Sequence, residues 1–497
     1  MAKSKVTLLN MITGLILQVC TVISGFVVPK IILTYFGSNT NGLIASLGQF
    51  LNYIALIEGG ITSVVTANLY KPIVNNDFAK VSSVLVTAKK FYKKIAAIFV
   101  GYSLVVSIAF PLLKKTQFSF SYVFVLSMII AVGIFIQYMF SLTLKTLLDA
   151  DKKSYIVSIT QSVIIVLNIL LVIVCVRIYP SIHLLKAISA VLFVIQPILY
   201  GRYVNKNYCI DWSAQPNNEL MKNRWNGFAI NTAAFIHNCT DIAVLTIFTD
   251  LSIVSIYSVY ALVANGLKQL LNSLFTGINP VIGQAYAKND HKVLNLKLDI
   301  YEYIVFLLVF FAFTLCSMLI TPFVLLYTKN VNDSNYNQIT FGILLSISEA
   351  IYLIKAPHLG LAYTANQFKK LSVPAYLEAG INIVTSILLV QYIGLVGVAI
   401  GTIAGMTYRM IFHVYYTTKL VKGRKQIIFY RKMLYFMVAT FGAVLLCNHI
   451  PIDSTSIGGW IVAAIVYSVI LILIYSIMSI IVFRKELRYI FDYIGKR

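Results

Sequence analysis

Long apolar segments alternate with short polar segments along the whole chain. Most apolar segments have about 20 residues or more, the length that an α-helix needs to cross the hydrocarbon core of a bilayer. Because lipid offers the backbone no hydrogen-bond partners, and because the segments are too long for barrel strands, we predict an all-α integral membrane protein. The fourteen predicted transmembrane helices span residues 8–34, 42–67, 95–113, 119–143, 155–178, 182–203, 226–248, 251–285, 301–327, 338–362, 371–392, 394–418, 433–450 and 458–483.

Composition supports a membrane protein, because 59% of the 497 residues are hydrophobic and only 11% are charged, against about 25% charged in a soluble protein. No long segment is polar enough to form a separate aqueous domain, which excludes a soluble enzyme and a single-span receptor. The net charge of +23 would suggest a nucleic-acid partner if the basic residues formed one patch on a soluble fold. They lie instead in short clusters between apolar segments, so we predict no nucleic-acid partner.

The six cysteines lie far apart and form no C-x-x-C pair. All except Cys209 fall inside apolar segments, where cysteine behaves as a small hydrophobic residue. We therefore predict neither a disulfide framework nor a metal site. The sequence also gives no reason to assign a cofactor or a catalytic residue.

The distribution of basic residues predicts the orientation in the membrane. If the N-terminus is cytoplasmic, most of the 40 basic residues fall in cytoplasmic segments, and only Lys114, Lys115, Arg177 and Lys329 fall outside. Positive charge is enriched in cytoplasmic loops. We predict an uncleaved first helix and a multi-pass protein of the cytoplasmic (inner) membrane, with both termini in the cytoplasm.

An internal repeat is visible in the sequence. The segment from Phe36 to Asp77 has the same succession of span and loop as the segment from Phe248 to Asp290. A second pair of similar segments is "KKSYIVSITQSVIIVLNILLV" and, further on, "KKLSVPAYLEAGINIVTSILLV". We predict an N-terminal six-helix bundle over residues 1–205, a cytoplasmic linker over 206–225, a C-terminal six-helix bundle over 226–420, and an additional helix pair over 433–483. Six spans are an even number, so the two bundles enter the membrane from the same side as parallel repeats.

Charged residues inside the predicted spans are candidates for function, because each costs about 2.5 to 3.5 kcal/mol at the centre of a membrane helix. Such residues face a cavity or pair with one another. Nine residues of this kind are selected as candidates: Lys30, Glu58, Lys186, Asp241, Lys268, Glu349, Lys355, Glu378 and Arg409.

Two roles are assigned within this set. Lys30, Lys268, Lys355 and Arg409 are predicted to line a cavity and bind an anionic group such as a diphosphate, since Lys offers a point charge and Arg a bidentate fork. Glu58, Asp241, Glu349 and Glu378 are candidates for coupling to a proton or a sodium ion, or for gating. For both groups the alternative is a structural ion pair within the bundle.

Two segments resemble a known family. The first, "VVPKIILTYFGSNTNGLIASLGQFLNYIALIEGG", contains Pro29, Gly37, Gly42 and Glu58, and the second is "IGLVGVAIGTIAG" at Ile393–Gly405. They are similar to the corresponding helices of polysaccharide repeat-unit (Wzx-type) flippases in the multidrug/oligosaccharidyl-lipid/polysaccharide (MOP) exporter superfamily.

The resemblance implies a transporter with a central cavity that works by alternating access. Its substrate would be an undecaprenyl-diphosphate-linked oligosaccharide repeat unit, moved across the cytoplasmic membrane for capsule or O-antigen biosynthesis. Membrane lipid and a polysaccharide polymerase are the further partners that it implies.

Two other functions are weighed against this one. A cation-coupled exporter of small toxic compounds shares the fold, but its site would favour acidic and aromatic residues. A membrane-embedded glycosyltransferase or polymerase would need a large outer loop for its active site. The longest predicted outer connection, about residues 327–338, is too short for one, so we predict a protein that is not an enzyme.

Overall fold

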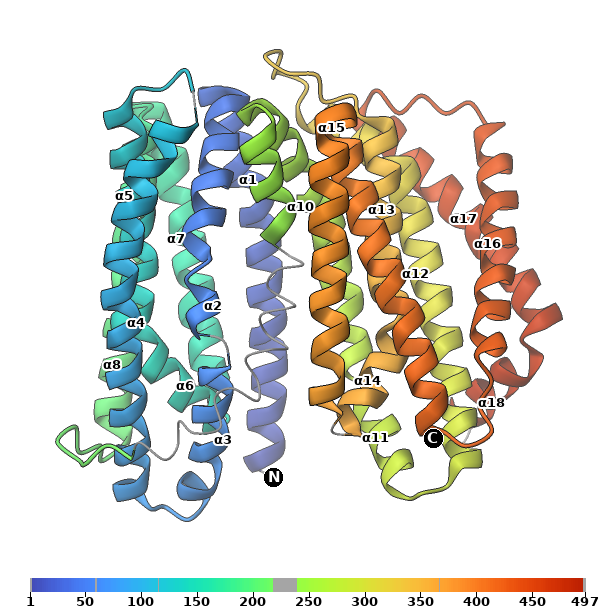
Figure 1. Cartoon of the computed structure of the whole chain (residues 1–497), viewed down its shortest axis with the longest axis horizontal. Helices are drawn as coiled ribbons and strands as arrows, with labels where there is room; N and C mark the ends of the chain where they lie inside the picture. The colour runs from blue at the N-terminus through green and yellow to red at the C-terminus, as the bar shows by residue number, and fades with distance from the viewer. Residues whose placement is uncertain (1, 59, 115, 218–238, 366, 495–497) are drawn as a thin grey trace. The chain divides into compact units, whose positions relative to one another are not determined.

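The computed structural model describes residues 2–58, 60–114, 116–217, 239–365 and 367–494 (Figure 1). Throughout these ranges the regular structure is helical. Among the described residues, eleven helices are long and apolar enough to cross a membrane. The chain is thus an all-α, multi-pass membrane protein, as the apolar segments predict.

Contacts divide the chain into two compact units, Met1–Ser255 (unit 1) and Ile256–Arg497 (unit 2). The helices of unit 1 are α1 (Ala2–Asn52), α2 (Ala55–Glu58), α3 (Ile61–Val74), α4 (Phe78–Leu113), α5 (Phe120–Ile136), the π-helix η1 (Gln137–Ser141), α6 (Leu142–Ala150), α7 (Ser154–Ile178) and α8 (Ile182–Asn207). A shorter apolar helix, Cys239–Phe248, follows. The division into units falls inside α10 (Leu251–Thr276).

Unit 2 continues from α10 to the C-terminus. Its other helices are α11 (Asn279–Ala287), α12 (His291–Tyr327), α13 (Ile339–Ile354), α14 (Ala356–Thr364), α15 (Phe368–Leu420), α16 (Gln426–Asn448), α17 (Ile457–Val482) and α18 (Arg484–Ile494). The predicted domain boundaries rest on the internal repeat and are a different division from these contact-based units. They stay a prediction.

Two of the long helices each contain two predicted spans. α1 is two helices joined at Gly37 (φ 80°), and α15 is two helices joined at Gly394 (φ 55°). Glycine adopts such positive φ values without the steric cost that other residues incur. Figure 1 shows the chain reversing direction at both turns. With these two hairpins and the helix 239–248, the helices correspond to the fourteen predicted spans, although span 226–248 lies partly outside the described residues.

Several predicted spans are interrupted where the sequence analysis expected continuous helices. Span 42–67 stops at Asn52 and resumes as α2 and α3, with Gly60 in the left-handed conformation (φ 87°) before α3. Spans 251–285 and 338–362 each break before a proline, Pro280 and Pro357, which occupies the first turn of α11 and of α14. Proline is accommodated in a first turn, because its missing N–H is not needed there.

The two repeat segments end in the same local structure. Asn76 and Asn289 both have φ 54°, and the next residue in each case is an aspartate that caps a long helix. Asp77 accepts a hydrogen bond from the backbone N–H of Lys80 in α4, and Asp290 accepts hydrogen bonds at the start of α12. Asparagine tolerates the left-handed conformation and aspartate is a favoured N-cap, so the shared "ND" dipeptide starts both helices.

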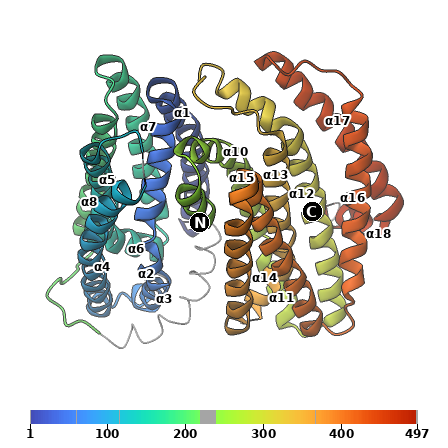
Figure 2. The same ribbon diagram turned by 45° about the horizontal axis from the view of Figure 1, so that its top comes forward.

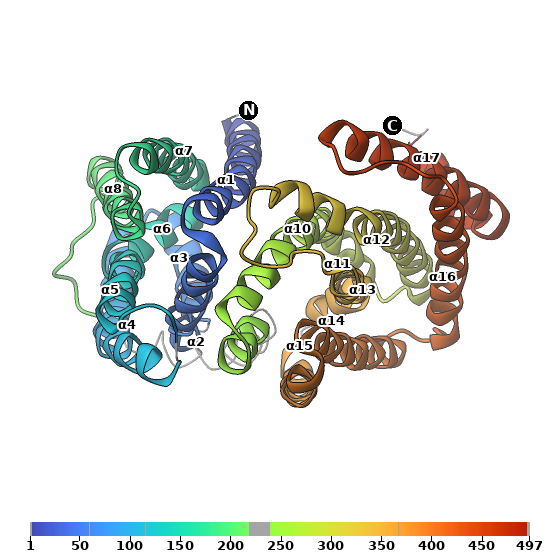
Figure 3. The same ribbon diagram turned by 90° about the horizontal axis from the view of Figure 1, so that it is seen from above.

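Each unit has its own arrangement of helices. In unit 1 each helix packs against the next in the order α4, α5, α8, α7 and α1 (Figure 3). Of the described residues of the buried core, α4 contributes more than any other helix. In unit 2, α12 contacts α13 on one side and the pair α16 and α17 on another. Figure 2 shows this C-terminal pair along the edge of unit 2.

Candidate functional site

Close contact between the two arms of α15 positions part of the candidate site. Gly397, Gly401 and Gly405 recur every four residues in the second arm and face the first arm. A Cβ atom at Gly401 would lie 2.1 Å from the Ser386 hydroxyl oxygen and 2.8 Å from the Ser386 backbone nitrogen. Only a stripe without side chains allows this approach, and it brings Glu378 on the first arm opposite Arg409 on the second.

We expect Gly401→Ala to destabilise the protein. The added methyl group has no free space, and overpacking of this kind costs about 1–3 kcal/mol. The measurement is the thermal unfolding midpoint of the purified protein in detergent. The matched control is Gly442→Ala in α16, where a Cβ atom would meet nothing within 4 Å, so the higher helix propensity of alanine should leave the midpoint unchanged or raise it. Equal midpoints for the two variants would contradict the close-packing interpretation.

Two of the ion pairs described in unit 2 join predicted cations to predicted carboxylates. The Nζ atom of Lys268 in α10 lies 3.0 Å from both carboxylate oxygens of Glu349 in α13. Arg409 donates a hydrogen bond through Nη1 to Glu378, and its Nε lies 3.3 Å from Nε2 of His413. All five side chains are buried. The two pairs match the structural ion pairs that the sequence analysis kept as the alternative role.

Lys355 is the third predicted cation of unit 2 and differs from the other two. It occupies the junction between α13 and α14 and is only 2% exposed. Its Nζ atom lies 4.0 Å from the ring centroid of Tyr352 and 3.3 Å from the sulfur of Met406. In the described part of the chain no carboxylate lies within 4.0 Å of this ammonium group. The centroid of the same Tyr352 ring is 5.1 Å from Nζ of Lys268, so the ring lies close to both lysine side chains.

We call Lys268, Glu349, Lys355, Glu378 and Arg409 the charged cluster. With every member ionised it carries three positive and two negative charges, and the excess positive charge belongs to Lys355. The ring face of Tyr352 attracts a cation, but it does not neutralise one. The cluster therefore has one positive charge, at Lys355, that no carboxylate of the cluster pairs with.

The other candidates lie in unit 1. Lys30 is half-buried in α1, and Asp241 is buried in the helix Cys239–Phe248. Glu58 lies at the end of α2, where its two carboxylate oxygens accept hydrogen bonds from Thr62 (2.5 Å) and Tyr138 (3.1 Å). The Thr62 hydroxyl also lies 2.8 Å from the Tyr92 hydroxyl. Within the described ranges no cation lies within 4.0 Å of Glu58, so hydroxyl groups are its partners there.

The sequence analysis missed a second group of charges in unit 2. Glu302 in α12 is fully buried and lies 2.5 Å from Nη2 of Arg424, 3.1 Å from Nζ of Lys432 and 3.1 Å from Nε2 of His358. Asp299 lies 2.8 Å from Lys432 and 3.2 Å from Arg424. The signal was present, because Asp299 and Glu302 are three residues apart and share a helix face.

We call these five residues the α12–α16 network, since it joins α12, α14, α16 and the segment before α16. Arg424 lies outside the membrane-spanning segments, and the nearby carboxylates raise its pKa despite its burial. The guanidinium group therefore remains charged. Among the described residues no group of three or more His, Cys, Asp or Glu side chains could hold a metal ion.

Comparison with solved structures identifies the fold. A structure described as the lipid II flippase MurJ in an inward closed conformation matches with a TM-score of 0.71, over 97% of this chain and 100% of that chain, at 16% sequence identity. The chain has the fold of MOP transporters. A multidrug resistance MATE family transporter of the MOP superfamily in an inward-facing conformation matches with a TM-score of 0.67, over 81% and 96% of the two chains, at 12% identity. No family model and no curated protein sequence matches the chain.

Proposed function

We propose that the protein is a flippase that moves a polyprenyl-diphosphate-linked oligosaccharide across the cytoplasmic membrane for surface polysaccharide biosynthesis. Fold neighbours that include a lipid II flippase support this proposal at the level of architecture. The observation that carries it is Lys355, a buried lysine over the Tyr352 ring with no carboxylate within 4.0 Å in the described part of the chain. A buried charge is costly without a partner, and an anionic substrate group would supply one.

The charged cluster suggests how the diphosphate is held. Lys355 offers the first contact as a point charge, and Arg409 can provide a planar fork that suits phosphate oxygens. Arg409 would exchange Glu378 for phosphate, which releases the carboxylate and changes the contact between the two arms of α15. Such an exchange gives substrate binding a differential effect on two conformations, as alternating access requires. Lys30 belongs to unit 1, and its contact with the substrate stays a prediction.

The test is transport in proteoliposomes that contain the full-length protein. A fluorescent polyprenyl-diphosphate-linked oligosaccharide is placed in one leaflet, and its appearance in the other is compared with the efflux of a cationic dye. Protein-dependent flipping of the lipid and no movement of the dye is the expected result. Movement of the dye alone would favour the cation-coupled exporter and would overturn the proposal.

Glu58 is a better candidate for binding a proton or sodium ion than Glu349 or Glu378. Glu349 and Glu378 have Lys268 and Arg409 as partners, whereas hydroxyl groups surround Glu58. Oxygen-rich surroundings suit a sodium ion or a shared proton. The helix break before α3 and the π-helix at Tyr138 give the surrounding backbone two places to rearrange, and π-helical turns are frequent at functional sites.

We expect Glu58→Gln to abolish the dependence of transport on pH and sodium, because an amide keeps the shape but takes up no proton. Initial flipping rates are compared across a pH series, with sodium or with choline as the cation. The control is Glu486→Gln in α18, outside the predicted spans. An unchanged ion dependence in Glu58→Gln would exclude this carboxylate as the coupling group.

The proposed orientation, with both termini cytoplasmic, has its own test. Reporter enzymes fused after Asn76, Asn217 or Lys422 should be active on the cytoplasmic side, and a fusion after Lys329 should be active outside. The positive charge of the predicted cytoplasmic segments is the reason. A clean reversal at any one of these positions would contradict the predicted topology.

A further inference from the structure

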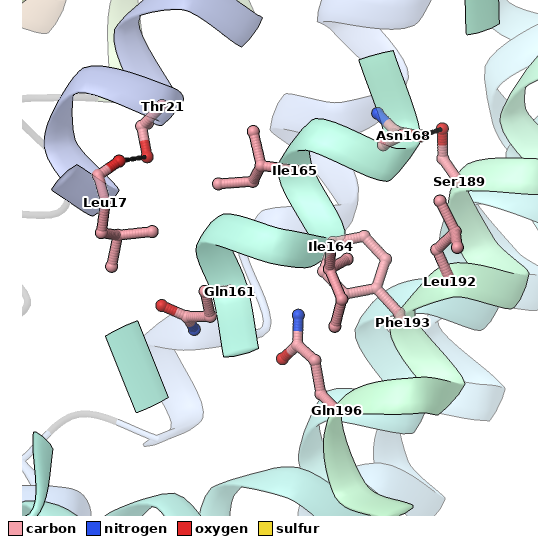
Figure 4. Close-up of a pocket in the computed structure, with 10 residues that line it drawn as sticks. All are labelled: Leu17, Thr21, Gln161, Ile164, Ile165, Asn168, Ser189, Leu192, Phe193 and Gln196. Atoms are coloured by element: carbon pink, nitrogen blue, oxygen red, sulfur yellow. Dashed lines mark hydrogen bonds between the residues drawn. The ribbon is translucent and has the colours of Figure 1, made fainter. Parts of the chain in front are cut away.

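A partly open pocket of about 280 Å³ lies in unit 1 between α1, α7 and α8 (Figure 4). Its lining includes five polar side chains within membrane-spanning helices: Thr21, Gln161, Asn168, Ser189 and Gln196. The other lining residues are leucine, isoleucine and phenylalanine, and no charged residue lines the pocket. It is separate from every residue to which substrate binding or ion coupling is assigned above.

Part of this polar lining is already hydrogen-bonded. Ser189 donates to Oδ1 of Asn168 over 2.7 Å, and Thr21 donates to the backbone carbonyl of Leu17 over 2.8 Å. The side-chain amides of Gln161 and Gln196, in contrast, have no hydrogen bond within the part of the chain that the structure describes. Figure 4 shows Gln161 on α7 and Gln196 on α8, with the two amides on different sides of the α7 ribbon in this view.

The position of Gln196 makes its lack of a partner costly. Its side chain is only 8% exposed, while Val163 and Phe193 next to the pocket are 51% and 40% exposed on the surface that would face lipid. The amide atoms of Gln196 are open to the pocket, and lipid tails inside it could not satisfy them. The pocket thus combines an apolar entrance with two amides that each offer a donor and an acceptor.

We propose that this pocket binds an uncharged amphiphile that enters from the lipid, with an amide, hydroxyl or carbonyl group on an apolar chain. The absence of lining charges disfavours phosphate or ammonium headgroups. Ligand pockets usually span about 300–1,000 Å³, so this pocket takes the polar end of the molecule and leaves the chain in the bilayer. Either glutamine complements a primary amide, which also has both a donor and an acceptor.

The test uses the full-length protein in phosphatidylcholine vesicles and a long-chain primary fatty amide that carries a photoreactive diazirine beside the amide. An alkane of the same length with the diazirine at the same position is the comparison probe. We expect the amide probe to label the pocket segments of α7 and α8 about tenfold more than the alkane, with labelling that saturates and that unlabelled amide competes away. Gln196→Met, which keeps the size of the side chain, should lower amide labelling about fivefold, as the loss of one net hydrogen bond implies.

The matched control is Gln137→Met in η1, an exposed glutamine of a membrane-spanning segment that does not line the pocket. It should leave labelling unchanged. Gln196→Met should unfold at the same temperature as the unmodified protein or above it, because no hydrogen bond to a described residue is lost, so a loss of labelling will not reflect misfolding. Equal labelling by both probes would show ordinary acyl chains in the pocket. Labelling that does not saturate would indicate water or no ligand, and either result would overturn the proposal.

Discussion

Replacing Glu302 with glutamine is expected to destabilise the protein by about 3–5 kcal/mol, the cost of breaking a buried ion pair by removing one partner. The glutamine keeps the shape of the side chain, but Arg424 and Lys432 then have only Asp299 to balance them. Because the network joins α12 to α16, the C-terminal helix pair should detach first. The measurement is the thermal unfolding midpoint in detergent together with the amount of protein in the membrane.

A second substitution separates charge imbalance from loss of packing. Lys432→Met in the Glu302→Gln background removes one of the uncompensated cations, so it should recover part of the lost stability. Glu486→Gln in α18 is the control for removing a carboxylate outside the network. The network would have no stabilising role if Glu302→Gln unfolded at the same temperature as this control.

Lys355→Met is expected to weaken binding of the diphosphate-linked substrate by about 1.5–3 kcal/mol, the value of a hydrogen bond to a charged group. The same change should leave stability almost unaltered, since no described carboxylate loses an ion-pair partner. Methionine has a similar length and can still pack against Tyr352 and Met406. Binding of a fluorescent substrate and the unfolding midpoint are measured on the same preparation, with Lys355→Arg as the variant that keeps the charge.

Lys268→Met provides the contrast, because Lys268 is paired with Glu349. Its removal leaves a buried carboxylate without its cation, so this variant should be unstable, and Lys268→Met with Glu349→Gln should be rescued. Normal substrate binding by a well-folded Lys355→Met protein would end the cationic-site hypothesis. Loss of stability in Lys355→Met would assign this residue a structural role instead.

The fourteen spans could be predicted from the sequence because apolar length alone decides what crosses a bilayer. The need of buried charges for partners was equally predictable, since Lys268, Glu349, Glu378 and Arg409 all lie within apolar segments. Which cation pairs with which carboxylate could not be predicted, because Lys268 and Glu349 are 81 residues apart and only packing brings them together. Their pairing follows from contacts between helices that no local pattern encodes.

The α12–α16 network was missed for a different reason. Arg424 lies in a polar connection and Lys432 near the start of α16, where positive charges are ordinary in a membrane protein and were read as cytoplasmic markers. Asp299 lies in the part of α12 that precedes the predicted span, and Glu302 falls at the start of that span. Hydropathy locates the membrane but does not distinguish a solvated charge from one buried where helices converge.

The turns at Gly37 and Gly394 also bear on how the chain is inserted into the membrane. No charged residue lies within three positions of either glycine, so each hairpin can pass its tip through the bilayer without carrying an ion across hydrocarbon. The two helices of a hairpin then enter the bilayer together. The basic residues beyond their far ends stay on the side of the membrane where the protein is synthesised. A single arginine placed next to either glycine would add a charge to the translocated tip and should lower the yield of correctly inserted protein.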